Sequence, residues 1–238
     1  MSSFVSASTV LPAHREPITL TTADGITLVG ELAVPADRPP QATLICFHPL
    51  PTHGGSMDSH LFRKAAWRLP AQAGLAVLRF NSRGTSSPEG TSGGQFSAGG
   101  AEKYDLNAAL EFATKRFLPR LWLVGWSFGT DVVLLYGCQP GVEGALLLSP
   151  PLARADDVEL TAWGSSGKQV TVMVPEFDDY LRPAEARQRF SLVPQARVIG
   201  VEGAHHLWVG EKYVTQVLNQ MMECAVPGLN RAAPAPAR

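Results

Sequence analysis

The hydrophobic residues of this chain gather into short continuous runs, and segments with helical spacing lie between the runs. Short apolar runs are typical of strands that are buried on both faces of a sheet. Six such runs occur, at residues 42–47, 75–80, 121–125, 145–148, 170–174 and 197–201. Apolar residues recur every three or four positions within 57–69, 106–117 and 214–221. This alternation predicts an α/β fold with a mostly parallel, doubly wound sheet and right-handed crossovers.

The two ends of the chain differ from this pattern. Residues 18–22 and 26–34 flank Ala-Asp-Gly, a turn sequence, and predict an N-terminal antiparallel hairpin. Residues 227–238 are rich in Ala and Pro and predict a disordered tail. For a chain of 238 residues we expect one domain, residues 16–226, after a leader of residues 1–15.

Charge and cysteine content narrow the classes of function. The 20 Lys and Arg residues balance 21 Asp and Glu residues, so the chain has no basic field of the kind that binds nucleic acid or anionic membrane. Its three cysteines, Cys46, Cys138 and Cys224, cannot all pair within one chain, which favours a reducing, cytoplasmic location. No apolar run approaches the roughly 18 residues of a membrane span. We therefore expect no nucleic-acid partner and no membrane span.

The segment 125–129, Gly-Trp-Ser-Phe-Gly, fits the G-x-S-x-G pattern of a nucleophile elbow. The pattern alone is weak in a chain with 22 Gly. Its context is more specific, because an apolar run precedes it and a helical segment, 132–136, follows it. A sharp strand-to-helix turn exposes the seryl oxygen, and the helix N-terminus stabilises nearby negative charge. Ser127 is therefore the candidate nucleophile; the alternative is an ordinary turn that contains a serine.

A nucleophilic serine requires a base, and the base requires an orienting partner. His205 and His206 are the histidines after the elbow, and they follow the last predicted strand. Another predicted strand leads into Asp178 and Asp179, so the chain order Ser, Asp, His is the one this chemistry has in α/β sheets. The alternatives are a surface loop for the histidines and a helix N-terminus before Pro183 for the acids.

A serine that attacks a substrate carbonyl also needs an oxyanion hole, that is, N–H donors aimed at the oxygen on which negative charge develops. One donor comes from the residue after the nucleophile, Phe128, and the other from the loop after the third strand. That loop, residues 47–55, contains two prolines, which have no N–H, so Leu50 is the best candidate. In an alternative interpretation, His48 and His53 of the same loop are catalytic residues or metal ligands.

Taken together, these features resemble the α/β-hydrolase superfamily from about residue 18 to residue 224. His-Pro-Leu-Pro-x-x-Gly-Gly-x-Met-Asp at 48–58 and Arg-Phe-Asn-x-Arg-Gly at 79–84 are similar to small hydrolases with a His-Pro-His-Pro loop, often grouped with dienelactone-hydrolase-like enzymes. Leu50 stands where that subgroup has its second histidine. Ser127 stands where true dienelactone hydrolases have cysteine, so their substrate does not carry over.

The resemblance also selects among neighbouring residues. It implies His206 as the base, because the family histidine closes a Gly-Ala-x-His stretch. It implies Asp178 as the acid, because the family acid commonly ends Gly-x-x-Asp, although Pro175 replaces the glycine here. Asp179 stays an alternative, since it lies four residues before Pro183, a spacing also seen in relatives.

The predicted activity is that of a carboxylesterase-like serine hydrolase that cleaves small acyl esters through an acyl-enzyme. No metal or organic cofactor is expected, and the partner is a small-molecule ester. The segment 152–168 is too short for a cap domain, which predicts an open site, and the Gly- and Ser-rich loop 84–100 is either part of the site's rim or a flexible surface loop. The alternatives are an acyl thioesterase and a catalytically idle fold used for binding.

Overall fold

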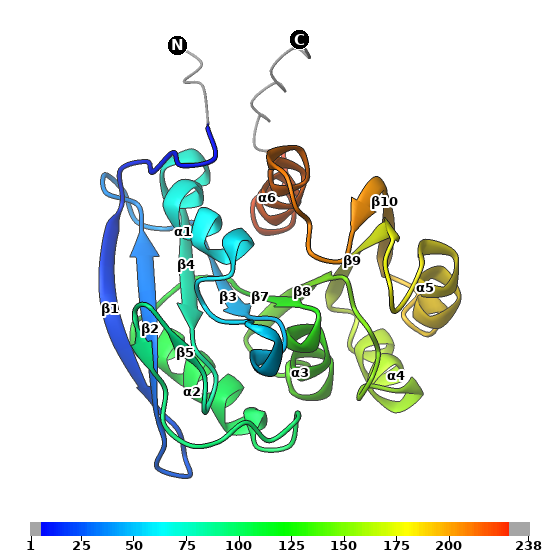
Figure 1. Ribbon diagram of the computed structural model, residues 1–238, viewed down its shortest axis with the longest axis horizontal. Helices are drawn as coiled ribbons and strands as arrows, with labels where there is room; N and C mark the ends of the chain where they lie inside the picture. The colour runs from blue at the N-terminus through cyan, green and yellow to red at the C-terminus, as the bar shows by residue number, and fades with distance from the viewer. Residues whose placement is uncertain (1–5, 229–238) are drawn as a thin grey trace.

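Eight strands form one mixed sheet in the computed structural model, which describes residues 6–228 (Figure 1). Their order across the sheet is β1-β2-β4-β3-β7-β8-β9-β10. The strands are β1 His14–Thr21, β2 Thr27–Val34, β3 Ala42–Phe47, β4 Leu75–Phe80, β7 Leu121–Trp126, β8 Val142–Leu148, β9 Gln169–Phe177 and β10 Arg197–His205. β1 and β2 form an antiparallel hairpin, β2 also runs antiparallel to β4, and all other neighbours are parallel. The predicted mostly parallel sheet with an N-terminal hairpin is confirmed.

Helices cover both faces of the sheet. They are α1 His60–Ala73, α2 Glu102–Lys115, α3 Phe128–Tyr136, α4 Asp157–Ser166, α5 Pro183–Arg189 and α6 Glu211–Ala225. Figure 1 shows α1 and α6 on one side of the central strands and α2, α3 and α4 on the other. The remaining regular elements among residues 6–228 are short. They are two 3-10 turns, η1 Pro51–His53 and η2 Phe190–Leu192, and a hairpin of β5 Ser86–Ser87 with β6 Gly90–Thr91.

This double cover explains the continuous apolar runs of the sequence. Every residue of β3, β4 and β7 is buried, since successive side chains point to opposite faces and both faces are packed. In β3, Ile45 and Phe47 join the core under α2 and α3, whereas Leu44 and Cys46 join the core under α1 and α6. A parallel strand between two helical layers has no solvent-exposed face, so its sequence is mainly apolar instead of alternating between apolar and polar residues.

Two helices were not predicted from the sequence. α5 begins at Pro183, where a helix start was considered only as the alternative to a catalytic acid. α4 lies within the segment 152–168, and a capping box of Asp156 and Glu159 at its start was the missed signal. Leu160 and Trp163 of α4 are fully buried in the core that also contains α3, so this segment adds to the helical layer.

Parallel strands bring their carboxyl ends to one edge of the sheet. Five of these ends, those of β3, β7, β8, β9 and β10, carry the polar residues His48, Ser127, Ser149, Asp178 and His206. No helix within residues 6–228 has the length and apolar character needed to cross a membrane. The predicted tail lies outside the described residues from position 229 onward.

Candidate active site

Ser127 lies in a sharp turn between β7 and α3. Its φ of 51° and ψ of −119° are unusual for a residue with a side chain, and such strain is typical of functional turns. The two flanking glycines permit the turn. A Cβ at Gly129 would lie 2.0 Å from the carbonyl oxygen of Phe47, and a Cβ at Gly125 would lie 2.6 Å from that of Gly129. Both glycines of the G-x-S-x-G pattern are thus required by close backbone packing.

The structure brings Ser127, His206 and Asp178 together in one hydrogen-bonded chain. Nε2 of His206 lies 2.9 Å from Oγ of Ser127, and Nδ1 lies 2.9 Å from Oδ2 of Asp178. An ionised carboxylate can only accept hydrogen bonds, so Nδ1 carries the proton. Nε2 then has its lone pair directed at the seryl hydroxyl, which is the arrangement that a general base needs.

Asp178 and Asp179 have different environments. Asp178 is 2% exposed, and its Oδ1 accepts hydrogen bonds from the backbone N–H groups of Tyr180 at 2.9 Å and Leu181 at 3.3 Å. Burial favours a higher pKa, but the hydrogen bonds from His206 and from these N–H groups outweigh it and hold the pKa of Asp178 below its ordinary value. Asp179 is exposed and the structure does not bring it to the imidazole.

The neighbouring histidine is arranged differently. His205 ends β10, is exposed, and stacks on Phe177 with ring centroids 5.3 Å apart. Tyr180 covers the imidazole of His206 instead, with centroids 4.7 Å apart, and is itself 65% exposed. Leu207 is also exposed, so apolar side chains border the histidine on the solvent side.

The two proposed oxyanion donors have free N–H groups. Phe128 is the first residue of α3, and the first N–H groups of a helix have no partner within it. The N–H of Leu50 makes no hydrogen bond to any other residue in the range 6–228. The close approach of Gly129 to the end of β3 places the first turn of α3 against the loop that begins at His48.

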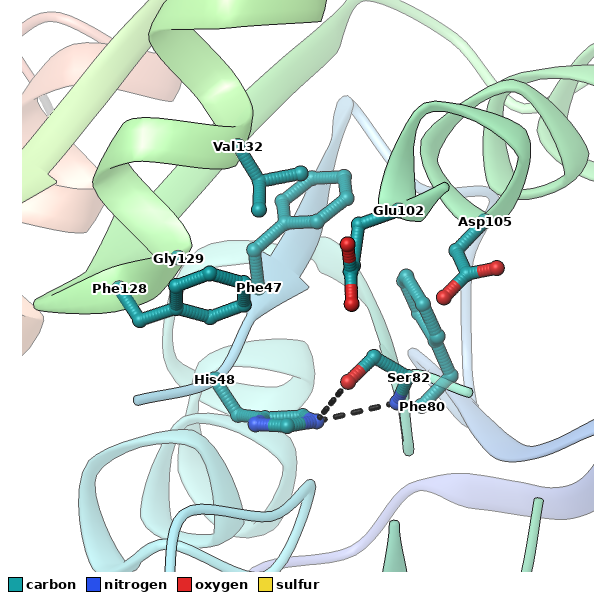
Figure 2. A pocket seen from close by; sticks show the side chains of 9 residues that line it. All are labelled: Phe47, His48, Phe80, Ser82, Glu102, Asp105, Phe128, Gly129 and Val132. Atoms are coloured by element: carbon teal, nitrogen blue, oxygen red, sulfur yellow. Dashed lines mark hydrogen bonds between the residues drawn. The ribbon is translucent and has the colours of Figure 1, made fainter. Parts of the chain in front are cut away.

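His48 holds this loop from inside the protein (Figure 2). Its Nδ1 lies 2.7 Å from the carbonyl oxygen of Pro49, and its Nε2 accepts from the backbone N–H of Ser82 at 3.0 Å. Nδ1 is therefore the protonated nitrogen. In a trans peptide the N–H points away from the C=O, so a fixed Pro49 carbonyl also fixes the direction of the Leu50 N–H. The sequence showed this histidine but not its contacts.

Burial decides the charge of His48. The side chain is 3% exposed, and burial lowers its pKa from the ordinary 6.5 to about 4, so the ring is neutral near pH 7. A cavity of about 10 Å³ lies beside it, about the room of one water molecule, and is lined by the residues labelled in Figure 2. His53 is exposed, and within residues 6–228 no three His, Cys, Asp or Glu side chains are grouped to hold a metal.

Comparison with known proteins relates this architecture to a known fold. No family profile and no curated protein matches the sequence. The structure is similar to an α/β serine hydrolase without a lid from Xanthomonas campestris, with a TM-score of 0.73, 24% identity and coverage of 94% of this chain and 99% of the other. An esterase from Pyrococcus furiosus gives a TM-score of 0.75 at 17% identity and covers 92% of each chain. The chain has the α/β-hydrolase fold.

A third similar structure with the α/β-hydrolase fold is a serine hydrolase homologue from Coxiella burnetii. Its TM-score is 0.69 at 22% identity, with 96% of this chain and all of the other covered. The superfamily resemblance seen in the sequence is thereby confirmed at the level of the fold. The closer resemblance to the His-Pro-His-Pro subgroup stays a prediction.

Proposed function

We propose that this protein is a serine hydrolase that cleaves carboxylic esters of small acyl groups. The main support is the continuous chain of hydrogen bonds from Ser127 through His206 to Asp178, beginning at a serine with strained backbone. The similarity to an α/β serine hydrolase and an esterase of the same fold points to the same class of chemistry. In this proposal Phe128 and Leu50 supply the oxyanion hole.

The reaction proceeds in two acyl transfers. Oγ of Ser127 attacks the ester carbonyl carbon while Nε2 of His206 takes its proton, and the carbonyl electron pair moves onto the oxygen. The N–H groups of Phe128 and Leu50 hold this oxyanion. Its collapse expels the alcohol, which receives the proton from His206. Water then attacks the acyl-enzyme with the same base, and the acid leaves as Ser127 regains its proton.

Asp178 has an electrostatic and orienting role in this scheme. Its pKa lies below the ordinary range, so it is ionised whenever the enzyme works near neutral pH. The carboxylate keeps the proton on Nδ1 and stabilises the imidazolium that forms in each transfer.

The preference for small acyl groups follows from the surroundings of the site. The connection between β8 and β9 contains only α4, whose buried residues pack with the sheet core. It therefore contributes no large cap that would shield a long acyl chain. The exposed Tyr180 and Leu207 offer a limited apolar surface beside His206 for one part of the ester.

A fluorophosphonate probe tests the proposal directly. An activated Ser127 labels covalently and Ser127→Ala does not, whereas a catalytically idle fold labels in neither form. A panel of p-nitrophenyl esters and acyl-CoA thioesters of graded chain length then defines the substrate. We expect the highest kcat/KM on acetyl or butyryl esters. Higher kcat/KM on long-chain esters would refute the size preference, and activity confined to the thioesters would reassign the substrate class.

A further inference from the structure

The backbone carbonyl of His206 is the centre of a buried hydrogen-bond network. The indole N–H of Trp126 and the hydroxyl of Ser149 both donate to this oxygen, each over 3.2 Å. Trp126 is 2% exposed and Ser149 is fully buried, so water does not replace either donor. The backbone of the histidine is therefore held from two sides.

The hydroxyl of Ser149 is oriented by a third residue. It accepts a hydrogen bond from the indole N–H of Trp208 over 2.9 Å, which leaves its own proton for the carbonyl of His206. Trp208 is fully buried, and its carbonyl oxygen lies 3.3 Å from Nε2 of His60 in α1. The network thus connects the segment after β10 with the helix that packs on the sheet.

Three residues in this region have positive φ although none of them is glycine. The φ angles are 51° at Ser127, 50° at Ser149 and 54° at Trp208. Side chains disfavour this conformation, and it persists only where surrounding contacts hold it. The N–H of Ser127 donates to the Leu148 carbonyl and the N–H of Ser149 to the Met173 carbonyl, each over 2.9 Å. The two strained serines are thus tied to neighbouring strands.

The topology shows what the network joins. Trp126 is the last residue of β7 and Ser149 follows β8, whereas His206 follows β10. β9, the strand that leads to Asp178, lies between β8 and β10 in the sheet. The histidine is therefore anchored directly to the strands on the nucleophile's side, independently of its carboxylate partner.

We propose that Trp126 and Ser149 are positioning residues, which fix the backbone of His206 so that its imidazole reaches Ser127 and Asp178 at the same time. This inference rests on the proposed hydrolase function. Proton transfer to and from the imidazole recurs in both acyl transfers, whereas neither positioning side chain is exposed to bind substrate. Loss of either hydrogen bond should therefore lower kcat and leave KM little changed.

Two single variants and a matched control test the role. Trp126→Phe removes one indole N–H, and Ser149→Ala removes one hydroxyl. Trp163→Phe is the control, because its indole N–H also donates to a backbone carbonyl, that of Leu134, at 3.1 Å in a fully buried site between α4 and α3. We expect the first two to lower kcat about ten- to a hundredfold, since small misplacements of catalytic groups have effects of this size. Trp163→Phe should keep the wild-type kcat.

A double-mutant comparison separates positioning from general destabilisation. If Ser149 acts through the imidazole, Ser149→Ala should cause no further loss in the residual rate of His206→Ala, because residues that act as a unit are not additive. An equal loss in both backgrounds would overturn the inference.

Proton NMR gives a readout that does not depend on activity. The Nδ1 proton of His206, hydrogen-bonded to Asp178, should shift or broaden in Trp126→Phe and Ser149→Ala but not in Trp163→Phe. Unchanged resonances and unchanged kcat in both variants would overturn the positioning role and leave the hydrolase function standing. Absence of labelling and of all ester and thioester hydrolysis in the wild type would overturn the proposed function, and the resonances then decide the positioning role alone.

Discussion

Two buried histidines at the same edge of the sheet differ in their partners. His48, after β3, is 3% exposed, and His206, after β10, is 8% exposed. Nδ1 of His48 faces the Pro49 carbonyl, and Nε2 faces both the backbone N–H and the hydroxyl of Ser82. The partner of its protonated nitrogen is thus a neutral backbone carbonyl. His48 is therefore held as a neutral imidazole.

In the other loop the histidine also faces a serine hydroxyl, but its protonated nitrogen faces a carboxylate. Its nitrogens lie 2.9 Å from a carboxylate, that of Asp178, and 2.9 Å from a hydroxyl, that of Ser127. Burial alone therefore does not make a histidine a base. The charged partner of the protonated nitrogen distinguishes the proposed base, His206, from His48, and this contrast can be tested by substitution.

The largest effect is expected from Ser127→Ala and His206→Ala. Each removes a member of the proposed triad, and triad members act as a unit, so kcat should fall about 10⁴- to 10⁶-fold while the fold is retained. Steady-state ester hydrolysis measures the loss, and circular dichroism checks the fold. Near-wild-type hydrolysis by either folded variant would contradict the assignment of His206 as the base that acts on Ser127.

The next effect separates the two neighbouring acids. Asp178→Asn should lower kcat about 10⁴-fold, because an amide stabilises the wrong tautomer and cannot support the imidazolium. Asp179→Asn is the matched control. The side chain of Asp179 is exposed, so this substitution should lower kcat far less. The kcat values of the two variants are compared under identical conditions. If Asp179→Asn shows the large loss instead, Asp179 is the acid of the triad.

A smaller effect is expected from His48, through the loop that it holds. His48→Ala frees the Pro49 carbonyl and with it the direction of the Leu50 N–H, so kcat should fall about 10²-fold, as when one oxyanion donor is lost. His53→Ala, an exposed change in the same loop, should leave kcat unaltered. Equal kcat values for both variants would show that His48 does not shape the oxyanion hole.

A separate effect concerns stability at acid pH. Since the pKa of His48 falls from 6.5 to about 4 on folding, the unfolded chain holds more protons between these values, and stability decreases as pH falls from 6.5 toward 4. The loss attributable to this group is about 3 kcal/mol. Urea unfolding across this range should show it in the wild type and not in His48→Asn. Parallel pH dependences in the two proteins would contradict a neutral, buried His48.

The fold was largely accessible from the sequence, and the site only in part. Apolar runs such as 42–47 and 75–80 coincide with β3 and β4, because a strand between two helical layers must be apolar throughout. α4 was missed because a mere two of its residues, Leu160 and Trp163, are buried. The order of Ser127, an acid and a histidine was readable, since strand ends in this topology meet at one edge.

What the sequence determined by itself is local: which segments are apolar, where the sharp turn of Ser127 occurs, and which residue types follow each strand. Residue types and their order left open which neighbour of each pair faces inward, because successive side chains leave an extended chain in opposite directions, and the tertiary structure shows that His206 and Asp178 do. It also decided the partners of His48 and the anchoring of His206 by Trp126 and Ser149. These contacts join residues up to 80 positions apart in the sequence, and a local sequence pattern does not predict contacts between residues so far apart.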